Sequence, residues 1–329
     1  MNPNRVVALA ILAAAACGGD NAVQPDPTPS ERIEAARNAP DGATYQVIAH
    51  VLVTFLKPLV GSDPAGFSIQ AQAAGPALFV AVDPASLTPP PVVGDDVTFT
   101  ITVMGTTGGM RQAMGIAGWS RESQGTSIGG MVQNVSNRSD LVSNVTGYET
   151  ELIHAAGTIT SAFSTSGPGF GASSVSTVGL PADPSLKLRV PTSLAGSLDL
   201  ANGCDFVLDN VPLWRTGATA QLSAWSAFDV QVSGCPAPNV AGAEAGSSTS
   251  VDVRFDRLVA PTSVDANGSQ FTIPGLTVSA AVVNGKIVTL TTTAQSTSTS
   301  YTVTVSTTVT DTYGTSINAA SNSATFTGF

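Results

Sequence analysis

The side chains that could act as a general base or a nucleophile are few in this sequence. It contains only two histidines, His50 and His154, and both lie in segments with strand-like alternation. Nucleophilic catalysis normally pairs a serine or cysteine with a histidine base, and no HExxH, CxxC or phosphate-loop motif is present. The adjacent carboxylates Asp95 and Asp96 stand in a predicted turn, where they are more suited to ending a loop than to acid–base chemistry. The sequence therefore predicts a non-catalytic protein that needs no cofactor.

Carboxylates in the last third of the chain raise the question of a calcium site, because calcium binds oxygen ligands and can stabilise extracellular β domains. The candidates are Asp252, Asp256, Asp265 and Asp311. They do not form a DxDxDG run, so turn-forming and solvent-facing roles are favoured. No metal site is predicted.

The first of the three cysteines stands where an N-terminal apolar run stops. Arg5 supplies a positive charge, residues 6–16 are apolar, and Cys17 follows, which is the layout of a secretory signal peptide. The stretch Ala14 to Cys17 resembles the bacterial lipobox. That resemblance implies that residues 1–16 are removed and that Cys17 is lipidated, placing the protein in the bacterial cell envelope. By resemblance to lipoprotein sorting in Gram-negative bacteria, Gly18 after the cysteine allows delivery to the outer membrane, and we expect the protein to be exposed at the surface. An ordinary export signal with Cys17 near the cut by chance remains the alternative.

The other two cysteines, Cys204 and Cys235, are predicted to form a disulfide. If Cys17 carries lipid, these two are left as one pair, and an oxidising compartment lets them close a loop of about thirty residues. A metal site is the competing interpretation, but isolated thiols without CxxC spacing or a neighbouring histidine argue against it.

Composition indicates an all-β fold. Charged residues make up only 11% of the chain and the formal net charge is −10, while Gly, Ser, Thr, Ala and Val are abundant. No later apolar run is long enough to span a membrane. Residues 17–43 are rich in proline, glycine and polar residues and read as a lipidated tether, within which Ser30 could cap a short helix that ends at Arg37.

An internal repeat organises the body of the chain. Residues 94–119 align without gaps on residues 203–228, and looser landmarks upstream match Phe67 with Phe170 and residues 78–82 with 186–190. A repeated pattern most simply specifies repeated strands. The sequence therefore predicts two modules of about five strands each, at 44–149 and 150–235.

The first module carries a recognisable series of motifs, namely LysPro at 57–58, GFSIQ at 66–70, PALFVAV at 76–82, VGDDVTF at 93–99 and GGMRQ at 108–112. This series resembles the small OB-like modules (oligonucleotide/oligosaccharide-binding fold) of secreted bacterial proteins, some of them beside extracellular nucleases. The resemblance implies a five-stranded barrel in each copy, with strands two and three as the ligand face. On that basis Phe67, Gln70 and Phe79 lie on or near the ligand face. Packing inside the barrel is the alternative for both phenylalanines.

Charge argues against nucleic acid as the ligand. Between residues 44 and 232 there are seven Lys or Arg and thirteen Asp or Glu, a net charge of 7 − 13 = −6, which repels phosphates. The best local candidates for a basic, stacking groove are Lys187, Arg189, Trp214 and Arg215. Trp119, Trp214 and Trp225 could stack on sugars, although burial in a small barrel is the simpler role for each.

The last region, residues 236–329, is nearly free of charge and alternates Thr, Val and Ser. Its motifs, in order, are VDVRFDRLVAPTSV at 251–264, QFTI at 270–273, YTVTV at 301–305, TDTYG at 310–314 and ATFTG at 324–328. Together they resemble a bacterial Ig-like domain of the kind found in surface-layer and adhesin-like proteins. The resemblance implies a seven-stranded sandwich.

Two functions follow from these observations. The first is a non-catalytic cell-envelope lipoprotein whose modules bind a glycan, a protein or another envelope component. The alternative is an accessory nucleic-acid-binding protein for extracellular DNA use. Net acidity and the adhesin-like third domain favour the first.

Overall fold

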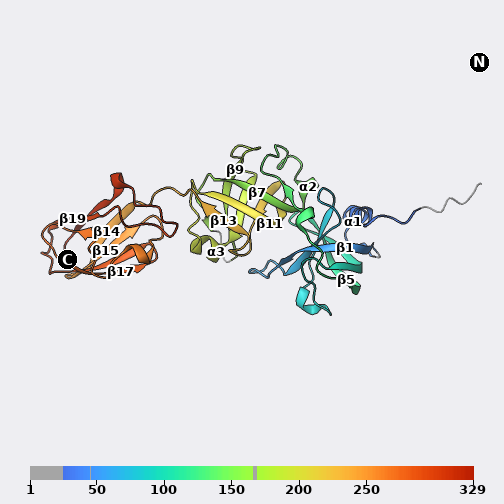
Figure 1. The fold of residues 1–329 in the computed structure, drawn as a ribbon, viewed down its shortest axis with the longest axis horizontal. Coiled ribbons are helices and arrows are strands. Elements are labelled where there is room, and N and C mark those ends of the chain that lie inside the picture. Colours follow the sequence, from blue (N-terminus) through green and yellow to red (C-terminus); the bar gives the residue numbers. More distant parts are fainter. Residues whose placement is uncertain (1–24, 45, 166–168) are drawn as a thin grey trace, which may run out of the picture.

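The computed structural model describes residues 25–44, 46–165 and 169–329. Cys17 lies outside the described residues, so its lipidation stays a prediction. Figure 1 shows three β bodies in a row, with the first barrel and its helix at one end and the C-terminal sandwich at the other. In the described part of the chain, no helix is both long and apolar enough to cross a membrane.

The first body is a closed barrel with strand order β1-β2-β3-β5-β4. Its strands are β1 (Gln46–Lys57), β2 (Gly66–Gln70), β3 (Ala77–Val80), β4 (Asp96–Thr107) and β5 (Met110–Ser123). Strands β3 and β5 run parallel, and the other neighbours are antiparallel. A short helical turn, η1 (Pro84–Ser86), follows β3.

A helix closes one end of this barrel. Helix α1 (Pro29–Asn38) begins at Thr28, whose side chain accepts a hydrogen bond from the Glu31 N–H while Glu31 bonds back to Thr28. The predicted helix is confirmed, but its cap is Thr28 and not Ser30. Because Ile33 is fully buried in the core of the first barrel, this part of the predicted tether belongs to the folded body.

The second body repeats the first. Strands β7, β9, β10, β12 and β11 close a ring in that order, with β10 and β12 parallel. Their bounds are β7 (Leu152–Ile159), β9 (Phe170–Thr177), β10 (Leu186–Pro191), β11 (Asp205–Thr216) and β12 (Thr219–Ser223). The short strands β6 (Gln133–Asn134), β8 (Ser164–Thr165) and β13 (Val230–Ser233) pair at its margins, with η2 (Gly129–Met131), α2 (Val145–Tyr148) and α3 (Thr192–Ser197) between strands.

The repeat predicted from the sequence is therefore a structural repeat, since β4 and β11 begin 109 residues apart, at Asp96 and Asp205. The last pair of the aligned segments, Trp119 with Phe228, is not equivalent in the structure, so that part of the prediction is wrong. Trp119 lies in β5, whereas β12 ends at Ser223 and Phe228 stands in a turn with its side chain 97% exposed.

The third body is a two-sheet sandwich. One sheet has four strands in the order β14-β15-β18-β17 and the other has three in the order β16-β19-β20. The bounds are β14 (Val240–Ser247), β15 (Ser250–Phe255), β16 (Phe271–Thr272), β17 (Val278–Asn284), β18 (Ile287–Thr292), β19 (Ser300–Val305) and β20 (Ser323–Thr327), with η3 (Pro261–Ser263) and η4 (Ala319–Ser321) between them. The inward residues of both sheets share one apolar core. The predicted fold class, two small barrels followed by an Ig-like sandwich, is confirmed.

A disulfide fastens the end of the second barrel, and a buried ion cluster joins the sandwich to that barrel. Cys204 and Cys235 are bonded, with their Cα atoms 3.9 Å apart, as predicted. The buried carboxylate of Asp199 accepts from Arg257 Nε at 2.6 Å and from the Leu258 N–H at 2.8 Å. Lys286 Nζ adds a third contact at 2.8 Å. Asp199 and Arg257 are 58 residues apart, so no local sequence pattern predicts this cluster.

Candidate functional site

Strands β2 and β3 were expected to form the ligand face of the first barrel, but neither of their faces is open. Phe67 points inward, with its ring 6.3 Å from Phe99 and 5.5 Å from Trp119. Phe79 points outward and is still fully buried, because its ring packs edge-on against Trp214 of the second barrel at 4.9 Å.

Gln70 lies on the same outer face and is also fully buried. Its side-chain oxygen accepts the Leu152 N–H at 3.0 Å, and its amide nitrogen donates to the Met131 carbonyl at 3.1 Å. The second barrel thus covers the face. The expectation that Phe67, Gln70 and Phe79 line an open ligand face is corrected by this burial, since Phe67 packs inside the first barrel and the second barrel covers Gln70 and Phe79.

A buried lysine adds to this interface. Lys57 Nζ lies 5.8 Å from the Phe79 ring centre and 5.6 Å from the Trp214 ring, and it pairs with Asp63 at 3.4 Å. Burial lowers the pKa of Lys57, and the Asp63 carboxylate offsets part of that effect. Arg189 of the second barrel binds the same carboxylate at 2.8 Å. One acidic residue therefore links cations of both barrels.

The chain segment 148–151 forms the other half of the interface, and all four of its residues are buried. The Glu149 carboxylate accepts the Arg111 N–H of the first barrel at 3.0 Å and pairs with Arg215 of the second. Arg37 from α1 lies 3.6 Å from the same carboxylate. Helix, first barrel and second barrel thus meet at Glu149.

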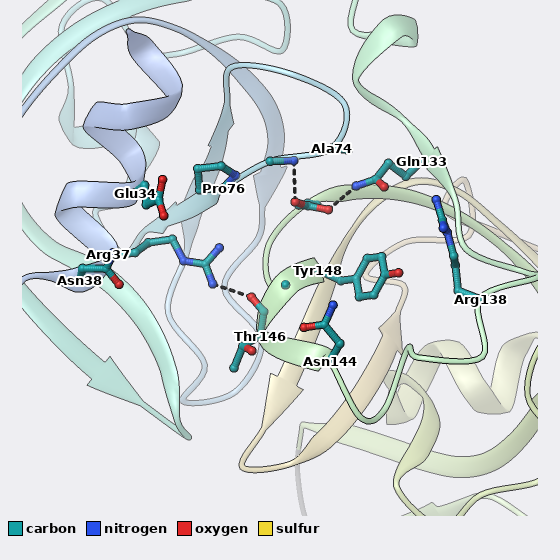
Figure 2. Close-up of a pocket in the computed structure, with 13 residues that line it drawn as sticks. Glu34, Arg37, Asn38, Ala74, Pro76, Gln133, Arg138, Asn144, Thr146 and Tyr148 are labelled. Atoms are coloured by element: carbon teal, nitrogen blue, oxygen red, sulfur yellow. Dashed lines mark hydrogen bonds between the residues drawn. The ribbon is translucent and has the colours of Figure 1, made fainter. Parts of the chain in front are cut away.

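A cleft opens beside this segment (Figure 2). Its volume is about 510 Å³, and its walls come from α1, the loop between β2 and β3, strand β6 and the region around α2. We call it the joint cleft, because both barrels contribute to it. The polar side chains that line it include Asn38, Gln133, Arg138, Asn144, Tyr148 and Glu151.

Glu151 is the buried acidic group of the joint cleft, with 2% of its surface exposed. One carboxyl oxygen accepts the Gly75 N–H at 3.0 Å and the other accepts the Gln133 amide, so the carboxyl joins the two walls. Burial raises the pKa of Glu151 to about 7, with the two hydrogen bonds and the charge of Arg37 acting in the opposite direction. Glu151 therefore changes charge near neutral pH.

The two arginines of the cleft differ in their hydrogen bonds. Arg37 donates to the Thr146 carbonyl at 2.7 Å and to the Ala77 carbonyl at 3.4 Å, which fixes it as part of the wall. Arg138 is exposed, and within the described residues its guanidinium has no hydrogen-bond partner; Figure 2 shows it on the same side as Gln133. The Tyr148 hydroxyl donates to Asp140 at 2.8 Å, and this bond lowers the pKa of Asp140.

Catalytic groups do not converge on the cleft. His154 pairs with Asp209, and His50 lies 3.5 Å from Asp96, both away from the cleft lining. Over residues 25–44, 46–165 and 169–329 there is no cluster of three or more His, Cys, Asp or Glu that could hold a metal ion. In the sandwich, Asp311 accepts the N–H groups of Tyr313 and Thr315 within a turn.

The basic and aromatic residues proposed for nucleic acid do not form an open groove. Trp214 is 6% exposed, and its neighbour Arg215 is paired with Glu149. Arg189 is paired with Asp63, while Lys187 donates to Ser174 at 2.8 Å. The charged groups of Lys187, Arg189 and Arg215 are thus bonded to other groups of the protein. Trp119 and Trp225 also lie against other side chains, at 5.5 Å from Phe67 and 5.0 Å from Phe55.

The residues of the joint cleft were missed because they come from segments far apart in the sequence. A signal was present in the stretch YETELIHAAG, where Glu149 and Glu151 precede an apolar strand in a chain that is only 11% charged. If these two acidic residues are buried at the start of the strand, their carboxylates need hydrogen-bond donors or cations beside them.

Comparison with known proteins supports the last region most directly. Residues 231–328 match the family profile described as Bacterial Ig-like domain. The region is therefore consistent with a non-catalytic module of a bacterial cell surface. No curated protein matches the chain.

Two solved structures show weaker likeness. The N-terminal part of the bacterial S-layer protein SbsC is 26% identical over 28% of this chain and 24% of that chain, with a TM-score of 0.26. The match thus spans about a quarter of the S-layer fragment. The p204 HINb domain is 11% identical over 56% of this chain and 98% of that chain, also with a TM-score of 0.26. At this TM-score neither likeness supports an inference about this chain.

Proposed function

We propose that this chain is a non-catalytic binding protein of the bacterial cell envelope, held by a lipid on Cys17, and that the joint cleft binds a short saccharide segment. The observation that carries the proposal is the polar cleft of about 510 Å³ between the barrels. Small-molecule sites typically measure about 300–1,000 Å³. The outer face of β2 and β3, the usual alternative, is filled by the second barrel.

The lining of the cleft suits hydroxyl groups. Side-chain amides of Asn38, Gln133 and Asn144 both donate and accept hydrogen bonds, as sugar hydroxyls do. The charged residues of the lining are Glu34, Glu151, Arg37 and Arg138, whose formal charges cancel when all four are ionised. A polar cleft without net charge favours a saccharide over a lipid or a polyanion.

Nucleic acid is the less supported ligand. The net charge of −6 over residues 44–232 opposes phosphate binding, and Arg189 and Arg215 are paired with acidic residues. Retention on a heparin column at low salt, followed by elution with salt, would favour this alternative.

The saccharide proposal is tested by applying the purified protein to an array of immobilised envelope saccharides. Asn144→Ala and Arg138→Ala remove exposed polar groups from the cleft lining and should each weaken binding about tenfold, the equivalent of one hydrogen bond to a ligand. Gln231→Ala, an exposed amide of β13 outside the lining, is the matched control. Absence of binding to every saccharide, or equal binding by all three variants, would contradict the proposal.

A further inference from the structure

Glu151 has hydrogen-bond donors but no contacting cation. Its carboxyl accepts from the Gly75 N–H and the Gln133 amide, which are both neutral groups. Within the described residues no Lys, Arg or His nitrogen lies within 4.0 Å of it. Arg37, whose charge lowers the pKa of Glu151, is 3.6 Å from Glu149 and bonded to two backbone carbonyls. A carboxylate at this position is therefore desolvated, and the charge of Arg37 offsets only part of that cost.

The ionisable groups around the cleft leave the rest of this cost uncompensated. They are Glu34 and Arg37 on α1, Arg138, Asp140 and Tyr148 around α2, and Glu149. Glu149 forms ion pairs with Arg215 and Arg37, and Asp140 lies near Arg138. Each cation thus has an acidic neighbour other than Glu151.

We infer that the joint cleft selects a saccharide bearing a protonated amine, such as an amino sugar, and that this amine pairs with Glu151. The inference rests on the proposed saccharide function. An ammonium group in the cleft supplies the missing positive charge and three donors, while ring hydroxyls bind the neighbouring amides. The net charge of −10 over the chain attracts a cationic ligand at long range.

Proton exchange with solvent must accompany this binding. The pKa of Glu151 is raised to about 7 by burial, so at pH 6 the carboxyl is mostly protonated. An ammonium group favours the ionised carboxylate, so its binding releases a proton from Glu151. Affinity rises as the pH increases from 6 to 8, as long as the ligand amine stays protonated.

Calorimetric titration tests the inference with two probes, a glucosamine tetramer and its fully N-acetylated counterpart. At pH 7 the glucosamine tetramer is expected to bind at least about tenfold more tightly. At pH 6, titrations in two buffers of different ionisation enthalpy should show proton release that approaches one proton per site. This measurement needs only the unaltered protein.

Glu151→Gln should abolish both the preference for the amine and the proton release, because glutamine cannot ionise. Glu122→Gln removes an exposed carboxylate outside the cleft lining and should keep both. Equal affinity for the two tetramers, or titration without proton release, overturns the amine inference. Failure of both tetramers together with binding of a neutral saccharide on the array overturns it too, while leaving the proposed function intact. Failure of every saccharide removes both proposals.

Discussion

Glu151→Gln should raise the free energy of unfolding of the barrel pair relative to the unaltered protein. This advantage should be larger at pH 8 than at pH 4.5. The pKa of Glu151 is about 7 in the folded protein, against an ordinary value of 4.5. A raised pKa in the folded state means that the stability contributed by the protonated carboxyl is fully present below pH 4.5. That stability is lost as the pH rises through 7.

The magnitude follows from the size of the shift. A difference of 7 − 4.5 = 2.5 in pKa corresponds to about 3 kcal/mol, at about 1.4 kcal/mol for each tenfold change in proton affinity. Glutamine stays neutral at every pH and keeps a side-chain oxygen for the Gly75 N–H. The advantage of Glu151→Gln in free energy of unfolding should therefore grow by about 3 kcal/mol between pH 4.5 and pH 8.

Urea unfolding followed by tryptophan fluorescence measures this advantage. All three tryptophans, Trp119, Trp214 and Trp225, belong to the barrels, so the sandwich does not contribute to the signal. Glu122→Gln controls for the loss of one negative charge at an exposed position. A constant difference between Glu151→Gln and the unaltered protein across the pH range would refute the reasoning.

The remaining predictions concern the anchor, the interface and the disulfide. Cys17→Ser should release the protein from membranes or leave its precursor unprocessed, and unchanged processing and partition in cell fractions would remove the lipid anchor. Phe79→Ala should lower the free energy of unfolding of the barrels by about 3–5 kcal/mol, because its fully buried ring packs on Trp214; a loss below about 1 kcal/mol by urea unfolding would contradict that packing. Cys235→Ser should cost about 2–4 kcal/mol, and peptide mapping that finds both cysteines free in the native protein would disprove the bond to Cys204.

The strands were predictable because their signals are local. Alternation places Phe67 and Ile69 on one face of β2, and the pattern of β4 (Asp96–Thr107) recurs in β11 (Asp205–Thr216). Such patterns depend on neighbours within a few residues, so tertiary context changes them little. The cysteine pair was predictable by counting, since only two remained after Cys17 was assigned to the anchor.

The barrel interface was not predictable in the same way. Alternation separates two faces of β2 and β3, but it does not tell whether the outer face meets water or another domain. Ser68 and Gln70 are polar outward residues that suggest an open surface, and both are fully buried. Lys57 is buried as well, against the ordinary preference of lysine for solvent.

The joint cleft depends on still longer separations. Gln133 and Glu151 are 18 residues apart, while Gly75 is 76 residues from Glu151. Pairing of β6 with β7 places Gln133 beside Glu151, and the docking of the two barrels adds Gly75. The sequence showed acidic residues in an unusual place and could not show which donors they would meet.

The disulfide also decides how a mechanical load on the C-terminal sandwich enters the barrel. Without it, tension would reach β13 (Val230–Ser233) first and could peel this short marginal strand from β11 one hydrogen bond at a time. The bond from Cys235 to Cys204 passes the force instead to the residue before β11, a twelve-residue strand paired with β7 and β12 as well as β13. Several ladders must then shear together, so the barrel resists opening while the sandwich is pulled.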